Sequence, residues 1–102
     1  LATAAQIRAG AMSVAEAADA AIVRVEKLDC AIDALAVPNF EAAYAEARAL
    51  DAAGPREDQP LFGVPMTIKE SFDVAGLPTT WGHARFKDVP APRDALLVRR
   101  LK

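Results

Sequence analysis

The chain has 102 residues and a mass of 10.8 kDa, enough for one domain at most. Apolar residues make up 53% and charged residues 25%, an ordinary globular composition that excludes disorder. The net charge of −2 argues against binding to nucleic acid or an anionic membrane, and no apolar run approaches the roughly 20 residues of a membrane span. The single cysteine, Cys30, suits a reducing compartment, so we predict a soluble cytoplasmic protein.

The two ends suggest part of a larger protein. The chain starts at Leu1 and stops at Lys102, inside what reads as a helix just begun, for which Asp94 is the predicted N-cap. A domain rarely closes on an open helix. We therefore expect a fragment, the N-terminal portion of a single domain whose remainder is absent.

Composition divides the chain into a helical part, 1–54, and a strand-and-loop part, 55–102. The first part holds 20 of the 24 alanines and one of the seven prolines. Eight acids and four bases give it a charge of −4, whereas six acids and eight bases give the second part +2. There is no internal repeat and no low-complexity segment.

Two amphipathic helices are predicted in the first part, after a short helical piece that ends before Gly10. Ser13 and Glu16 form a capping-box motif that marks the start of the first helix. Asn39 is the predicted N-cap of the second helix, which ends at Gly54. Helical spacing places these residues on the inward faces: Val14, Ala18, Ala21, Val25 and Leu28 in the first helix, and Phe40, Ala43, Tyr44, Ala47 and Leu50 in the second.

Two strands and two loops are predicted around and after these helices. Residues 34–37 form a short apolar run stopped by Pro38, and Val64, Met66 and Ile68 alternate with more polar neighbours, as strands do. Residues 55–60 read as a polar linker and residues 77–82 as an ordered loop.

Most motifs of catalysis are missing. One histidine and one cysteine cannot build a zinc site, and there is no phosphate-binding loop or nucleophile elbow. By itself His83 is more typical of a satisfied loop histidine than of a catalyst, and Arg99, Arg100 and Lys102 suit the solvent face of a helix.

Lys69 is the main candidate for chemistry. It ends the alternating segment just before a loop shaped by glycine and proline, and such places often carry catalytic groups. Spacing alone still favours a lysine that extends from the polar face of a half-buried strand.

The residues themselves resemble a known family. The stretch Gly63-Val64-Pro65-Met66-Thr67-Ile68-Lys69-Glu70, followed by Asp73-Val74-Ala75-Gly76-Leu77-Pro78-Thr79-Thr80-Trp81-Gly82, is similar to the lysine-bearing segment of the amidase signature family. Three further segments fit the same family in the expected order. They are the capped helix from Ser13, the segment from Leu28 to Val37, and Arg93-Asp94-Ala95 with the helix start that follows. The resemblance implies an α/β fold, a mixed β-sheet surrounded by α-helices.

Members of that family hydrolyse amide bonds with a nucleophilic serine, a second serine in a cis peptide and a lysine, without metal or organic cofactor. The resemblance implies that Lys69 is the catalytic lysine, the base that relays a proton through the cis serine. The family's two serines lie in a later segment that these 102 residues do not contain, and Ser13 and Ser71 are not in such a context.

We expect the chain to be inactive alone. A lysine that acts as a base near neutral pH needs a pKa lowered from about 10.4 to roughly 7 or 8, and desolvation by surrounding protein is the usual cause. Two departures from the family pattern stand out. Glu70 replaces the usual Asp after the lysine, and His83 replaces a small residue after the glycine, which bears on substrate preference.

Three functions remain open. The first is hydrolysis of a small or medium carboxamide, with the rest of the domain as partner and a homodimer left open. The second is that of the glutaminase (A) subunit in a tRNA-dependent amidotransferase, although residues 73–78 look more like the general amidases. A co-purifying partner and a dependence on ATP and aminoacyl-tRNA would identify that glutaminase. The third is a truncated, non-catalytic relative.

Overall fold

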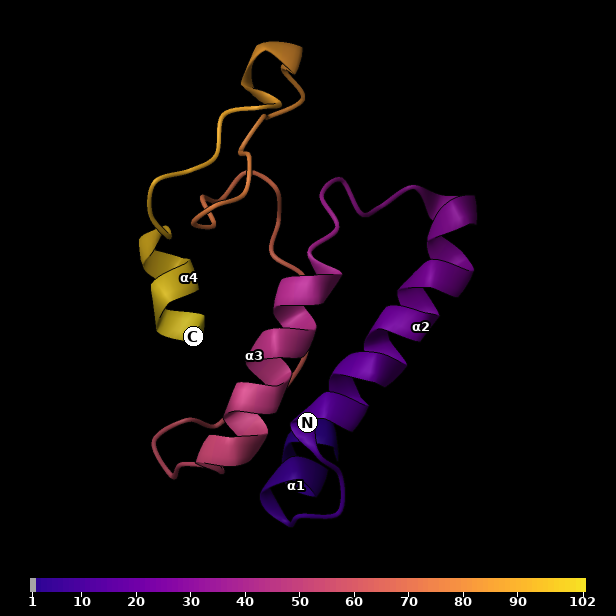
Figure 1. Ribbon diagram of the computed structural model, residues 1–102, viewed down its shortest axis with the longest axis vertical. Helices are drawn as coiled ribbons and strands as arrows, with labels where there is room; N and C mark the ends of the chain where they lie inside the picture. The colour runs from indigo at the N-terminus through magenta and orange to yellow at the C-terminus, as the bar shows by residue number, and fades with distance from the viewer. Residues whose placement is uncertain (1) are drawn as a thin grey trace. The chain divides into compact units, whose positions relative to one another are not determined.

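The computed structural model describes residues 2–102 and divides the chain into two compact units, residues 2–66 and 67–102. The first unit contains the helices α1 (Ala2–Arg8), α2 (Val14–Ile32) and α3 (Phe40–Ala53) (Figure 1). The second contains a single turn of 3₁₀-helix, η1 (Ala84–Phe86), and the short helix α4 (Leu96–Leu101). Among residues 2–102, no helix is both long enough and apolar enough to cross a membrane.

The start of α2 confirms the predicted capping box and adds a tertiary contact. The Ser13 hydroxyl accepts a hydrogen bond from the Glu16 amide at 3.0 Å, and Glu16 accepts one from the Ser13 amide at 2.8 Å. Asp51, in the last turn of α3, accepts from the amides of Val14 at 2.6 Å and Ala15 at 2.9 Å. The free amides of the first turn are therefore all satisfied, two of them by a side chain from another helix.

Helices α2 and α3 lie side by side and run antiparallel (Figure 1). The predicted inward face of α3 is confirmed, because its five residues are the ones in this helix that are not exposed. The predicted face of α2 is confirmed at four of its five residues, of which Val14 and Ala18 are buried and Ala21 and Val25 are half-buried. Leu28, however, is 42% exposed, and the buried residues of this helix are Val14, Ala17, Ala18 and Ile22.

The core of the first unit joins α1, α2, α3 and the segment after α3. Its buried members are Ile7, Val14, Ala17, Ala18, Ala47 and Phe62. Gly63 follows Phe62 with φ +69°, and a Cβ atom at this position would lie 2.5 Å from Cγ2 of Val14. The close approach of this segment to α2 therefore requires a glycine.

The second unit is built from turns and two isolated bridges. Residues 73–78 lie along residues 90–95: Ala75 pairs with Ala91, and Pro78 pairs with Pro90. Backbone bonds of 2.9 Å from Gly76 to Ala91 and 2.8 Å from Ala91 to Leu77 hold the two segments together.

Neither predicted strand is formed within residues 2–102, where residues 34–37 and 64–69 make no ladder. The alternation at Val64, Met66 and Ile68 is real, but alternation is insufficient without a neighbouring strand to supply hydrogen bonds. Residues 34–35 are instead tied to the end of α2, where Asp29 accepts from the amides of Ala34 and Leu35.

Two predicted N-caps form no capping bond. The N-cap of α4 is Ala95 rather than Asp94, and the Asn39 side chain makes no bond to the start of α3. Asp94 instead accepts a hydrogen bond from the Ala75 amide at 2.7 Å. A carboxylate near a helix start binds whichever amide the tertiary structure brings within reach, and here that amide belongs to the paired segment.

Candidate functional site

Lys69 lies in the second unit at the first position of a tight turn. Its carbonyl accepts a hydrogen bond from the Phe72 amide at 2.9 Å, which closes the turn over Glu70 and Ser71. Its side chain is exposed and makes neither a hydrogen bond nor an ion pair with any of residues 2–102. The backbone of this lysine is thus fixed while its ammonium group is free to meet other groups.

Glu70 connects this turn to the loop at residues 79–82. Its carboxylate accepts one hydrogen bond from the Thr80 amide and a second, at 3.1 Å, from the Trp81 amide. These bonds favour the ionised form, so the Thr80 amide above all lowers the pKa of Glu70 below its ordinary value. The Glu70 carboxylate is therefore held by a specific pair of bonds to the loop.

The loop that Glu70 holds has an uncommon backbone. Trp81 has φ +51°, in the left-handed region that few residues other than glycine adopt. The Thr80 hydroxyl accepts from the Gly82 amide at 3.0 Å, and the Thr80 carbonyl accepts from the His83 amide at 2.9 Å. Trp81 is 70% exposed, so these polar contacts, rather than apolar packing, fix this residue.

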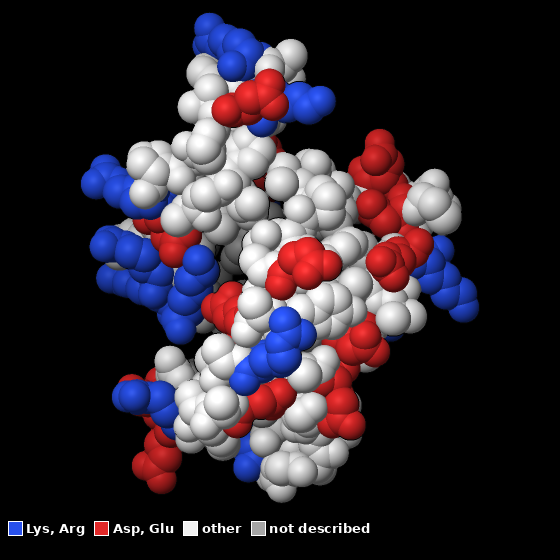
Figure 2. Space-filling view, viewed as in Figure 1, with Lys and Arg blue, Asp and Glu red and all other residues white. Residues whose placement is uncertain are grey.

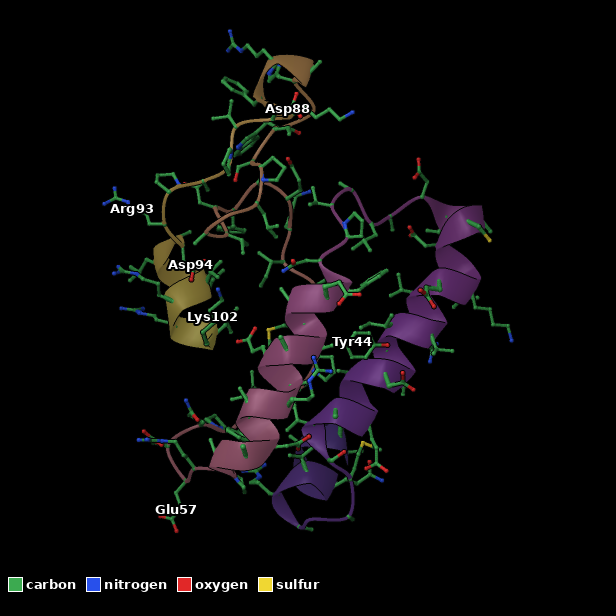
Figure 3. All side chains as sticks on the ribbon, viewed as in Figure 1. Tyr44, Glu57, Asp88, Arg93, Asp94 and Lys102 are labelled. Carbon is green, nitrogen blue, oxygen red and sulfur yellow. The ribbon has the colours of Figure 1, made fainter. Side chains whose placement is uncertain are left out.

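Asp94 is a second carboxylate that organises this unit. It accepts from the Ala75 amide and forms an ion pair of 2.9 Å with Lys102; both residues of the pair are labelled in Figure 3. The Ala75 amide and then the Lys102 ammonium lower the pKa of Asp94. In addition, the Ala95 amide donates to the Asp73 carbonyl at 2.8 Å, so the start of α4 is attached to the loop that follows Lys69.

The remaining candidates have structural surroundings. His83 is exposed and lies edge-on to Phe86, with ring centroids 6.3 Å apart, and the Arg85 guanidinium lies 4.4 Å from the centre of the Phe86 ring. Arg99 and Arg100 are exposed in the last turn of α4, and Figure 2 shows basic side chains gathered over this helix. A cation near a helix C-terminus is favourable in itself and needs no ligand to explain it.

The structure thus brings Lys69 and Glu70 together with the 79–82 loop. Ser13, in the first unit, is a helix cap. Sequence reasoning missed the contacts of Glu70 and Asp51, because each carboxylate meets amides that are ten or more positions away. The sequence predicted an ordered loop at residues 77–82 but not the carboxylate that holds it.

Comparison with known proteins identifies the family to which this sequence belongs. A sequence model described as Amidase matches residues 16–102. The chain belongs to the Amidase family. The matched range contains the Lys69 turn, the loop held by Glu70 and the helix α4.

Curated relatives extend the match over most of the chain. The A subunit of glutamyl-tRNA(Gln) amidotransferase from Nitratidesulfovibrio vulgaris (strain DP4) is 47% identical over 81 residues, which cover 79% of this chain and 17% of the relative. The protein of the same name from Oleidesulfovibrio alaskensis is 41% identical over 100 residues, covering 98% of this chain and 20% of that relative. The chain therefore spans about a fifth of the length of these relatives.

Proposed function

We propose that this chain is the lysine-bearing part of an enzyme that cleaves carboxamide C–N bonds, with Lys69 as the catalytic base. The observation that carries the proposal is the position of Lys69 within the matched range, on a fixed turn with an unengaged ammonium group. We also propose that the complete domain contains the mixed β-sheet that the resemblance implies. Residues 64–69 would join it as a strand once a neighbouring strand supplies hydrogen bonds.

In the proposed reaction, a serine oxygen bonds to the carbonyl carbon, the C–N bond breaks, and water then releases the acid. The proton of the serine passes to neutral Lys69 through a second serine and returns to the leaving nitrogen, so charge and atoms balance. Lys69 is the group that this chain contributes. Ser13 is engaged as a helix cap, and the nucleophile is assigned to another part of the protein.

The base role also requires burial that residues 2–102 do not provide. A lysine whose pKa falls from about 10.4 to roughly 7 or 8 needs about 3 to 5 kcal/mol of differential stabilisation, at 1.36 kcal/mol per unit. Lys69 is exposed in this structure. We propose that the remaining protein covers the turn and excludes water from it.

The test is amide turnover by a protein that contains the whole family domain around this segment. Lys69→Ala should lower kcat by about 10²- to 10⁴-fold, the usual contribution of a general base. Lys87→Ala removes another exposed lysine of the same unit and should leave turnover unchanged. The 102-residue chain alone should show no turnover. Activity that survives Lys69→Ala would exclude Lys69 as the base.

A second, narrower function is favoured by the names of the curated relatives. These proteins are named as the A subunit of an amidotransferase that acts on glutamyl-tRNA(Gln), which makes glutamine the natural candidate for the amide. The two functions separate in one assay. Glutamine hydrolysis that requires a co-purifying protein supports the amidotransferase, whereas hydrolysis of varied carboxamides by the isolated enzyme supports a general amidase.

A further inference from the structure

Among residues 2–102, Glu70 is the one side chain that joins the Lys69 turn to the 79–82 loop by hydrogen bonds. We propose that Glu70 is a positioning residue for Lys69: its carboxylate fixes the turn from which Lys69 extends by anchoring that turn to the loop. This proposal rests on the proposed function of Lys69 as the base.

Both oxygens of the Glu70 carboxylate take part in the anchor. One accepts from the Thr80 amide and the other from the Trp81 amide, at sequence separations of 10 and 11 residues. Within the same turn, the Lys69 carbonyl accepts a hydrogen bond from the Phe72 amide. Because the Lys69 side chain has no partner among residues 2–102, its direction depends on its backbone, and Glu70 is what holds that backbone to the loop.

The loop is a firm anchor because it is itself tied down. Thr80 accepts hydrogen bonds through both its hydroxyl and its carbonyl, from the amides of Gly82 and His83. The left-handed conformation of Trp81 persists only where surrounding bonds enforce it, and Glu70 supplies one of those bonds directly. Loss of the carboxylate should therefore release both the loop and the turn.

Two substitutions distinguish the hydrogen bonds of the Glu70 carboxylate from the mere presence of a side chain of similar size. Glu70→Gln keeps the length of the side chain but leaves one oxygen acceptor, so a side-chain amide group would face a backbone amide. Glu70→Asp keeps both oxygens on a side chain that is shorter by one methylene. Asp88→Asn is the matched control, because Asp88 is an exposed acid of the same unit that accepts no hydrogen bond from residues 2–102.

The decisive experiment measures kcat, KM and the thermal midpoint for these variants in the protein with the whole domain. We expect Glu70→Gln to lower kcat by about 10- to 100-fold, as misplacement of a catalytic group does, when kcat is measured well below the midpoint, while KM stays the same and the midpoint falls only slightly. Glu70→Asp should restore part of the loss, and Asp88→Asn should behave as the parent. Unchanged kcat in Glu70→Gln would overturn the proposal, and so would a loss that follows a lower midpoint without rescue by Asp.

A second measurement tests the anchor in the 102-residue chain, where Trp81 is the only tryptophan. Glu70→Gln should change the emission of Trp81 and its quenching by iodide, and Asp88→Asn should not. Identical emission would overturn the anchor itself. If instead Lys69 is not the catalytic base, the result is different, because Lys69→Ala would then be as active as the parent protein.

Discussion

The two units of the chain are stabilised in different ways. In residues 2–66, three helices bury apolar side chains from distant segments, including Ile7, Val14 and Phe62. In residues 67–102, only Ala91 and Val98 are buried apolar residues, whereas Trp81, Val89 and Leu96 are each more than half exposed. Carboxylates bound to backbone amides hold this second unit together.

This difference shows what each unit requires from its surroundings. Apolar burial is the main source of stability in the first unit, at roughly 25 cal/mol per Å² removed from water. The carboxylates of Glu16 and Asp51 add to it at the start of α2. The second unit depends on ionised Glu70 and Asp94 while it exposes large apolar side chains, an arrangement typical of a surface that other protein covers. The unit that carries the candidate base is the one less able to stand alone.

The largest expected effect comes from the core of the first unit. Ile7→Ala should lower the free energy of unfolding by about 2 to 5 kcal/mol, because Ile7 is only 5% exposed and its removal leaves a cavity. Urea unfolding followed by circular dichroism measures the change. Val23→Ala, at a position 53% exposed, should cost less than about 0.5 kcal/mol. If both variants unfold alike, the assigned core is wrong.

An intermediate effect is expected at Gly63. Gly63→Ala and Gly10→Ala both place a side chain at φ +69°, but only the first meets another residue, Val14. Beyond the backbone strain that both share, Gly63→Ala should cost about 1 to 3 kcal/mol more, as overpacking does. The same urea titration compares the two variants. Equal costs would mean that the segment after α3 does not lie against α2.

The smallest effect is the acid response of the second unit. Glu70 and Asp94 both have pKa values below the ordinary ones, chiefly because of the amides of Thr80 and Ala75. Their contribution to stability is therefore complete above the ordinary carboxyl range and is lost as the pH falls through the lowered values.

Trp81 emission should therefore change at acidic pH, whereas the helical signal of the first unit should change less. Its apolar core does not titrate, although Glu16 at the start of α2 also has a lowered pKa because of the Ser13 amide. Glu70→Gln is the control, because it removes one of the two titrating groups and should shrink the transition. A single transition shared by both signals would contradict the separate stabilisation of the two units.

Local signals in the sequence predicted local structure well. Three such predictions are confirmed: the capping box of Ser13 and Glu16, the inward face of α3, and the end of α3 at Gly54. Each depends on residues that lie within a few helical turns of one another. The strand predicted at residues 64–69 failed because a strand depends on its partner, which a residue pattern does not supply.

The candidate site shows the same division. The motif around Lys69 located the residue, and the resemblance to a family gave it a role that stays a proposal. The contacts that Glu70 makes with Thr80 and Trp81 could not be predicted, because nothing in a carboxylate says which distant amide it meets. The same holds for Asp94, which caps no helix and instead binds Ala75 and Lys102.

The two hydrogen bonds that Asp51 accepts from the start of α2 have a consequence for how this helix folds. The Asp51 carboxylate belongs to α3 but completes the first turn of α2, across sequence separations of 37 and 36 residues. Helix initiation is the costly step in forming any helix, and here part of its stabilisation arrives only after the second helix is in place. We therefore expect the amides of Val14 and Ala15 to become protected from hydrogen exchange only when α3 has packed against α2.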